Sequence, residues 1–171
     1  MARNIWVISD THFSHENILT FKNKYGSMVR DFTSVDEMNQ VMIDRWNESV
    51  KPGDKVYHLG DVFFGSKENF KRLWAKLNGS KRLIVGNHDD IKFLSSGGMF
   101  QKIQMWRVFS EFGLILTHVP VHQSGLTGRR GGLLNIHGHI HSNPSPEGPY
   151  KCVCVEQTGY APVNIEELRT K

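Results

Sequence analysis

The stretch NIWVISDTH, residues 4–12, joins a short apolar run to a polar, acidic end. The apolar run over 4–9 is typical of a buried β-strand. Asp10 and His12 follow it directly, and carboxylates and imidazoles are common metal ligands in proteins. The same order, an apolar run followed by Asp, Asn or His, returns along the chain and indicates how the fold is built.

Four later stretches repeat this order: KVYHLGD (55–61), KRLIVGNHD (81–89), LILTH (114–118) and NIHGHIHS (135–142). In α/β sheets, ligand sites collect beyond the carboxyl ends of the strands, where loops converge on a rigid scaffold. In the last stretch, His137, His139 and His141 are two residues apart, so on a strand or at its end they point to one face. Together the stretches predict a metal site at one edge of the fold.

Helices separate the first strands, and the later strands follow one another. Ser34 and Glu37 form a capping box at the start of a helix over 34–50. A second helix is predicted over 66–77, and both helices carry apolar residues at helical spacing. The remaining predicted elements are strands at 102–109, 112–117, 133–137 and 150–155, a glycine-rich loop at 122–132 and a short helix from Asn164. This order predicts an α/β sandwich with a mixed sheet, built as one domain over 1–171.

The composition is that of an ordinary globular protein. Of 171 residues, 39% are hydrophobic and 22% charged, and the formal net charge of +4 permits an anionic substrate without requiring nucleic acid. The densest basic cluster is interpreted as a solvated helix face; it comprises Lys67, Lys71, Arg72, Lys76, Lys81 and Arg82. Cys152 and Cys154 are expected as free, buried thiols in a reducing compartment. The absence of a long apolar run predicts a cytoplasmic protein with neither signal peptide nor membrane span.

Five motifs in order resemble the calcineurin-like metallophosphoesterases. The family pattern D-x-H, GD, GNH[DE], H and GHxH stands here as Asp10-Thr11-His12, Gly60-Asp61, Gly86-Asn87-His88-Asp89, His118 and Gly138-His139-Ile140-His141. The stretch DTHFSHENI and the small size are similar to the compact bacterial and phage members. The resemblance covers essentially the whole chain and implies a four-layered αββα sandwich of mixed sheets flanked by helices.

The resemblance also implies a ligand set for two divalent metal ions. One metal would be held by Asp10, His12 and His141, the other by Asn87, His118 and His139, with Asp61 bridging them. This mixture of ligands favours Mn²⁺, with Fe, Zn²⁺ and Ni²⁺ as alternatives. Two such metals clamp a phosphoryl group and activate a bridging hydroxide for attack. His88 would protonate the leaving group or stabilise charge on the phosphoryl oxygens.

The chain departs from the protein phosphatases of this superfamily. Those enzymes carry GDxVDRG and GNHE, whereas this chain has GDVFFG and GNHD. The missing aspartate argues against a protein phosphatase and against a His–Asp dyad at His88. Asp89 is expected at most to hold residues that bind the metals, without binding a metal itself.

Weaker candidates surround these motifs. His15 and Asn17 follow the first motif and would touch substrate or simply start a helix. Arg129 and Arg130 lie in the glycine-rich loop, where an arginine could bind phosphate, although a solvated loop is the favoured interpretation.

The predicted activity is hydrolysis of phosphate esters, with phosphodiesters favoured and a cyclic or nucleotide-derived small molecule as substrate. One alternative is a metal-dependent nuclease acting on DNA or RNA, and another is a non-catalytic scaffold for protein contacts. The oligomeric state stays open.

Overall fold

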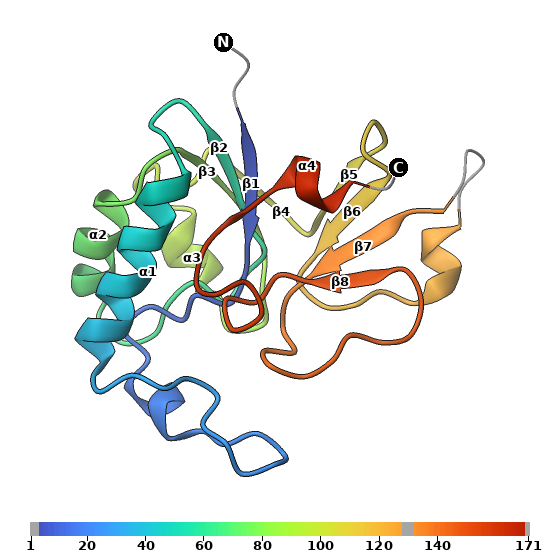
Figure 1. The fold of residues 1–171 in the computed structure, drawn as a ribbon. Helices are drawn as coiled ribbons and strands as arrows, with labels where there is room; N and C mark the ends of the chain where they lie inside the picture. The colour runs from blue at the N-terminus through green and yellow to red at the C-terminus, as the bar shows by residue number, and fades with distance from the viewer. Residues whose placement is uncertain (1–3, 128–131, 170–171) are drawn as a thin grey trace.

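The computed structural model describes residues 4–127 and 132–169 and contains two β-sheets packed face to face (Figure 1). The first sheet has the order β4-β3-β2-β1-β9, in which only β9 is antiparallel to its neighbour. Its strands are β1 (Ile5–Ile8), β2 (Lys55–His58), β3 (Ser80–Ile84), β4 (Lys102–Gln104) and β9 (Val163–Asn164). The second sheet has the order β5-β6-β7-β8, with β5 antiparallel to β6. Its strands are β5 (Trp106–Phe109), β6 (Leu114–Thr117), β7 (Leu134–His137) and β8 (Tyr150–Cys152).

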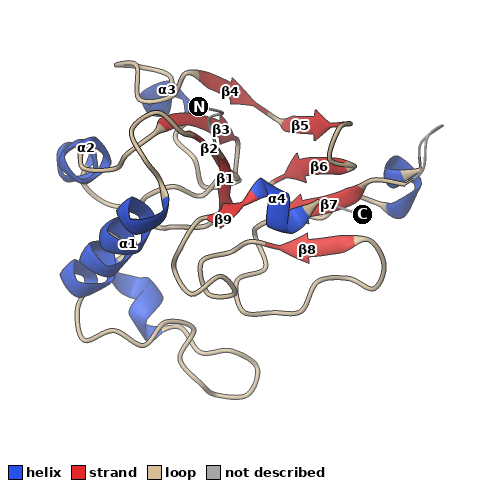
Figure 2. Ribbon diagram, turned by 45° about the horizontal axis from the view of Figure 1, so that its top comes forward, coloured by secondary structure: helices blue, strands red, loops and turns tan. Residues whose placement is uncertain are grey.

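The helices lie outside the two sheets. Figures 1 and 2 show α1 (Val35–Ser49), α2 (Lys67–Ala75) and α3 (Ile91–Leu94) against the first sheet. The 3₁₀ turn η2 (Gln123–Leu126) lies beside the second sheet, and the short α4 (Ile165–Leu168) packs against β1 and β9 of the first. η1 (Glu16–Thr20) precedes α1. The predicted architecture of two mixed sheets flanked by helices is confirmed. No helix within the described ranges is long and apolar enough to cross a membrane.

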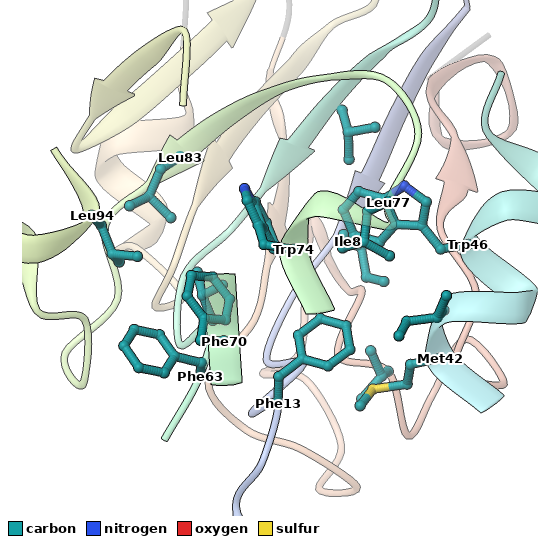
Figure 3. Packing of buried hydrophobic residues seen from close by; sticks show 14 of the residues in the cluster. Ile8, Phe13, Met42, Trp46, Phe63, Phe70, Trp74, Leu77, Leu83 and Leu94 are labelled. Carbon is teal, nitrogen blue, oxygen red and sulfur yellow. The ribbon is translucent and has the colours of Figure 1, made fainter. Parts of the chain in front are cut away.

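Two apolar clusters hold the layers together. The first lies between the helices and the first sheet, where Met42 and Trp46 of α1 meet Phe70 and Trp74 of α2 (Figure 3). The rings of Trp46 and Trp74 pack edge to face with centroids 6.0 Å apart. The predicted apolar stripes of both helices are therefore core. The second cluster lies between the sheets and is closed by α4; it includes Val7, Tyr57, Leu59, Leu114, Leu116, Ile136, Ile165 and Leu168.

The predicted helix starts are confirmed by their caps. Ser34 accepts a hydrogen bond from the amide of Glu37, and Asn164 caps α4 through the amide of Glu166. The Glu37 carboxylate also accepts from the amide and the hydroxyl of Thr33, one residue before the cap.

The single strand predicted over 102–109 is wrong. It is divided at Met105 into β4, which extends the first sheet, and β5, which begins the second. The apolar run KIQMWRVF has no glycine or proline to mark this crossing, so its periodicity reads as one strand.

The sheet topology places the predicted ligands at one edge of the molecule. β1, β2 and β3 are mutually parallel, so the loops that follow them all leave from the same edge. β6 and β7 are also parallel, and their following loops carry His118 and the segment 138–141. The backbone amide of His139 bonds to Asp10, which joins the loops of the two sheets.

Candidate metal centre

Seven side chains from five loops gather into two neighbouring groups. Cluster A consists of Asp10, His12 and His141, and cluster B contains Asp61, His118 and His139. Within each group of three, ligand atoms lie within 4.8 Å of one another. Asn87 adds an amide oxygen to cluster B.

Asp10 follows β1 and is fully buried. Only one of its two carboxylate oxygens has hydrogen-bond partners. Its Oδ2 accepts hydrogen bonds from Ser9 Oγ at 2.5 Å, the His139 amide at 2.8 Å and the Cys154 thiol at 3.3 Å. Its Oδ1 and His12 Nε2, 3.8 Å apart, are both buried without a hydrogen-bond partner in the described structure. Burial alone raises the pKa of Asp10, but His12 and other nearby histidines hold that pKa well below its usual range. Because buried polar atoms are nearly always paired, two orphaned atoms facing one another fit a bound cation.

His12 is oriented by a second histidine. Its Nδ1 lies 3.2 Å from Nδ1 of His15, whose ring stacks on Phe64 with centroids 4.0 Å apart. Burial lowers the pKa of His15 to about 4, so this ring is neutral near pH 7 and can accept a proton. If His12 binds a metal through Nε2, its Nδ1 carries the proton and donates to His15.

His141 is oriented by a buried ion pair. Its Nδ1 donates to Glu156 Oε1 at 2.9 Å, and the same oxygen accepts from Arg30 Nε at 2.8 Å. Arg30, only 1% exposed, also donates to the backbone carbonyls of Thr11 and Asp10. Burial alone would lower the pKa of His141, but the hydrogen bond to Glu156 raises it. The arrangement leaves Nε2 of His141 facing Asp10 Oδ1 at 4.0 Å.

Cluster B brings three atoms of metal-ligand type close together. His118 Nδ1 donates to the carbonyl of Leu59 at 2.7 Å, so Nε2 is the ring nitrogen that faces the cluster. That Nε2 lies 2.8 Å from Asn87 Oδ1, which is 3.0 Å from His139 Nδ1. Metal–ligand bonds of about 2.1 Å place adjacent ligands about 3 Å apart, so this spacing suits a metal ion.

Asp61 lies between the clusters. Its Oδ2 is 3.8 Å from His12 Nε2 in cluster A and 3.5 Å from His118 Nε2 in cluster B. Its Oδ1 accepts a hydrogen bond from the backbone amide of His88 at 2.9 Å, which fixes the carboxylate orientation. The Asp61 carboxylate therefore lies within reach of both clusters.

Three glycines of the motifs allow the ligand-bearing loops to approach one another closely. A Cβ on Gly60, which has φ +98°, would lie 2.8 Å from His118 Nδ1 and would collide with the backbone of Gly86. A Cβ on Gly86 would collide with the carboxylate of Asp61, and one on Gly138 would collide with the side chain of Asp10. Each glycine is thus required by close contact with a ligand-bearing segment.

Five of the candidate ligands have left-handed backbone conformations. Asp10, His12, Asp61, His139 and His141 have φ between 47° and 72°. Such conformations cost on the order of 1–3 kcal/mol each in non-glycine residues and cluster at functional sites. The fold therefore holds the ligand loops in strained shapes that direct the side chains inward.

His88 and Asp89, adjacent in sequence, diverge in space. The exposed ring of His88 is near cluster A, with its centroid 6.2 Å from that of His12 and 5.3 Å from that of Phe64. The carboxylate of Asp89 instead accepts from the backbone amides of Gly86, Asp61 and Val62 at 2.8–3.2 Å. Asp89 therefore ties two ligand loops together and does not contact the His88 ring.

The other predicted residues lie around the centre. His137 is buried and bonds to Ser145, and His58 is buried and bonds to Thr11, so neither faces the clusters. Asn17 is exposed and borders a hollow with His15. The sequence positions of Arg129 and Arg130 lie outside the described residues.

The sequence did not reveal Glu156 and Arg30, the two residues that hold His141 in place. Glu156 directly follows the predicted strand over 150–155, so the pattern of a strand ending in a ligand-type residue could have indicated it. Arg30 lies in an irregular segment between η1 and α1, with no periodicity that marks it as buried. Cys152 and Cys154 are free and buried, as predicted.

Comparison with known proteins agrees with this geometry. Residues 3–166 match the family model described as calcineurin-like phosphoesterase. An uncharacterised protein of Methanocaldococcus jannaschii is 37% identical, over 96% of this chain and 88% of its own length. The gene 66 protein of Mycobacterium phage L5 is 25% identical over 81% of this chain and 78% of its own. The crystal structure of a protein of unknown function from Aquifex aeolicus matches with a TM-score of 0.73 and 30% identity, covering 98% of both chains.

The family match covers nearly the whole chain, and the ligand-type side chains of all five motifs meet at one edge of the sandwich. The chain belongs to the calcineurin-like phosphoesterase family.

Proposed function

We infer that this protein hydrolyses phosphate esters on two divalent metal ions, and that phosphodiesters are its preferred substrates. The observation that carries this proposal is the pair of ligand clusters with the Asp61 carboxylate between them. Cluster A would hold one ion and cluster B, with Asn87, the other. When bound, two such ions polarise the phosphoryl group and supply a nucleophile derived from water. The mixed oxygen and nitrogen ligands favour Mn²⁺, with Fe, Zn²⁺ and Ni²⁺ as alternatives.

The side chains of the protein would orient the metal ligands and supply a proton to the leaving group. His15 and Glu156 fix the rings of His12 and His141, so the ligand lone pairs are directed before substrate arrives. His88 is exposed beside cluster A, where its ring can reach a departing alkoxide. A positioned acid of this kind contributes roughly 10²–10⁴-fold to the rate.

The surroundings of the centre favour a diester over a monoester. A hollow beside His141 is bordered by Lys22 and Lys24. Two further hollows flank the clusters, one lined by Asn87 and His118 and the other by His15 and Phe64. A diester has two organic groups, one for each hollow. Neither of these two hollows is lined by Lys or Arg in the described part of the chain, so both suit uncharged organic groups.

The basic cluster gives no support to the nuclease alternative. Lys67 pairs with Asp90 at 2.6 Å and lies over the ring of Phe93, and Lys81 donates to the carbonyl of Leu77. Two of the six side chains of this cluster are thus held by contacts within their own protein.

The test is hydrolysis after removal and return of metal. Protein stripped with a chelator should be inactive on bis(p-nitrophenyl) phosphate, and Mn²⁺ should restore turnover. The screen includes p-nitrophenyl phosphate, duplex DNA and single-stranded RNA as competing substrate classes. Full activity of the stripped protein would exclude the metal-dependent mechanism, and faster cleavage of nucleic acid than of small diesters would favour the nuclease.

A further inference from the structure

An apolar pocket opens directly beside cluster B. It has a volume of about 380 Å³, and its wall and floor include Gly86, Asn87, Thr117 and His118. We call it the apolar pocket; its apolar lining is Val85, Met105, Trp106, Ile115, Val119 and Val121. Asn87 and His118 belong to both the pocket and cluster B, so a molecule in one reaches the other.

The strand register explains why the pocket exists. Trp106 of β5 is paired with Thr117 of β6, and Ile115 is two residues earlier on β6, so all three side chains share one face. The alternate residues Leu114 and Leu116 are buried between the sheets. Figure 2 shows β5 at the rim of the second sheet, where the chain arrives from β4. The pocket is therefore formed on the outer face of that sheet.

The exposure of its lining indicates a binding surface. Trp106 is 61% exposed, Met105 62% and Val119 44%, and all three border the same pocket. Exposed large apolar side chains scattered singly need no explanation, but a contiguous group beside a polar centre is typical of a ligand site. The lining contains no Asp, Glu, Lys or Arg side chain, so the pocket suits an uncharged group.

The pocket and the proposed acid lie in different directions from the clusters. His88 and Phe64 pack near cluster A, and neither lines the pocket. If His88 protonates the leaving group, that group departs on the side of cluster A. The group beside cluster B is then the one that stays on phosphorus, which we call the retained group.

We propose that the apolar pocket binds the retained group of a phosphodiester and selects a flat aromatic ring as that group. This inference rests on the proposed function. An indole face and a thioether are well suited to stack on such a ring, which could be a phenyl group or a nucleobase. The alternative occupant is a second copy of this chain pairing along the edge strand β5. The shared lining with cluster B favours the substrate.

The experiment uses three diesters that all lose p-nitrophenolate and differ only in the retained group. These are thymidine 5′-(p-nitrophenyl) phosphate, bis(p-nitrophenyl) phosphate and methyl p-nitrophenyl phosphate. The wild-type protein with Mn²⁺ should show at least about 10-fold higher kcat/KM for the two aromatic esters than for the methyl ester. Trp106→Ala should lower kcat/KM about 10-fold for the aromatic esters and less than 2-fold for the methyl ester.

Two further variants guard against indirect effects. Met105→Ala, also at an exposed position, should reproduce the selective loss if Trp106→Ala folds poorly. Tyr25→Ala removes an 80% exposed aromatic ring that does not line the pocket, and it should change none of the three values. Equal losses on all three esters in both pocket variants would overturn the proposal.

A binding measurement separates this inference from the proposed function. Calorimetric titration of the metal-loaded protein should show tighter binding of thymidine 5′-phosphate than of methyl phosphate, and Trp106→Ala should abolish the difference. If the wild-type protein hydrolyses none of the esters, the proposed function fails, and this titration alone decides whether the pocket takes an aromatic group. A wild-type dimer that Trp106→Ala converts to a monomer would instead assign the pocket to an interface between copies.

Discussion

Glu156→Gln isolates the contribution of a charge that contacts cluster A only through His141. The glutamate accepts from His141 Nδ1 at 2.9 Å and from Arg30 Nε at 2.8 Å, and its side chain is only 3% exposed. Glutamine has nearly the same shape but no charge. It therefore weakens the bond that orients His141 and leaves the Arg30 guanidinium buried without a counter-ion.

The size of the effect follows from these contacts. Loss of a carboxylate that supports a metal-ligating histidine reduces metal affinity by about 10–100-fold, or roughly 1.4–2.7 kcal/mol. Breaking a buried ion pair by removing one partner costs about 3–5 kcal/mol of folding stability. Thr11 and Asp10 still offer carbonyl oxygens to Arg30, so we expect the lower end of that range.

The effect on metal affinity should depend on pH. The hydrogen bond to Glu156 raises the pKa of His141, so at low pH a proton competes with the metal for Nε2. Glutamine removes this contribution, lowers the pKa of His141 and weakens the competition. The loss of affinity should consequently be largest at pH 8 and smaller near pH 6.

The assay is competitive Mn²⁺ titration against a chromophoric chelator, combined with urea unfolding of the metal-free protein. Glu147→Gln, at an exposed position, is the matched control and should behave as wild type. The Glu156→Gln protein should show one weakened and one unchanged site. Wild-type affinity at both sites would refute the role assigned to Glu156, as would equal weakening of both.

Three further predictions concern other parts of the centre. His88→Ala should preserve metal content and slow turnover by about 10²–10⁴-fold. In steady-state assays the loss should be smaller for nitrophenyl than for alkyl leaving groups, and a loss of metal would make His88 a ligand. Gly86→Ala should displace the Asp61 carboxylate, destabilise the fold by about 1–3 kcal/mol and lower metal affinity in titrations. In the control Gly53→Ala the added Cβ meets nothing within 4 Å, so stability and metal affinity should not change. Burial lowers the pKa of His58 to about 3, against about 6.5 when unfolded, so acid favours the unfolded chain. Stability should fall by about 2.3 kcal/mol from this group between pH 6.5 and 4.5. Urea unfolding of His58→Gln should show a correspondingly shallower pH dependence, and an unchanged slope would contradict this assignment.

The sequence predicted those features that local pattern determines. The strand ends bearing Asp10, Asp61 and Asn87 could be found because each ligand directly follows its own apolar run. Helices α1 and α2 could be found because their apolar stripes have helical spacing and their first residues are capping types. Local residue order was sufficient for these elements.

Features that depend on the assembled fold were not predicted. The crossing at Met105 depends on which sheet offers a free edge, and the sequence run itself is uninterrupted. Arg30 is buried because three carbonyl and carboxylate partners from distant segments converge on it. The apolar pocket likewise joins residues from loops 85–87 and 119–121 to strands β5 and β6, a juxtaposition that only the sandwich creates.

If Asp61 joins two metal sites, its replacement should change the number of metal ions that the protein holds. Protein reconstituted with Mn²⁺, freed of excess metal by gel filtration and analysed by plasma mass spectrometry should contain two metal ions per chain. The Asp61→Asn protein, with nearly the same shape but no shared charge, should retain fewer than one ion and lose about 10²-fold or more in activity. A single ion in the wild-type protein, or two tightly held ions and near wild-type turnover in Asp61→Asn, would contradict the account.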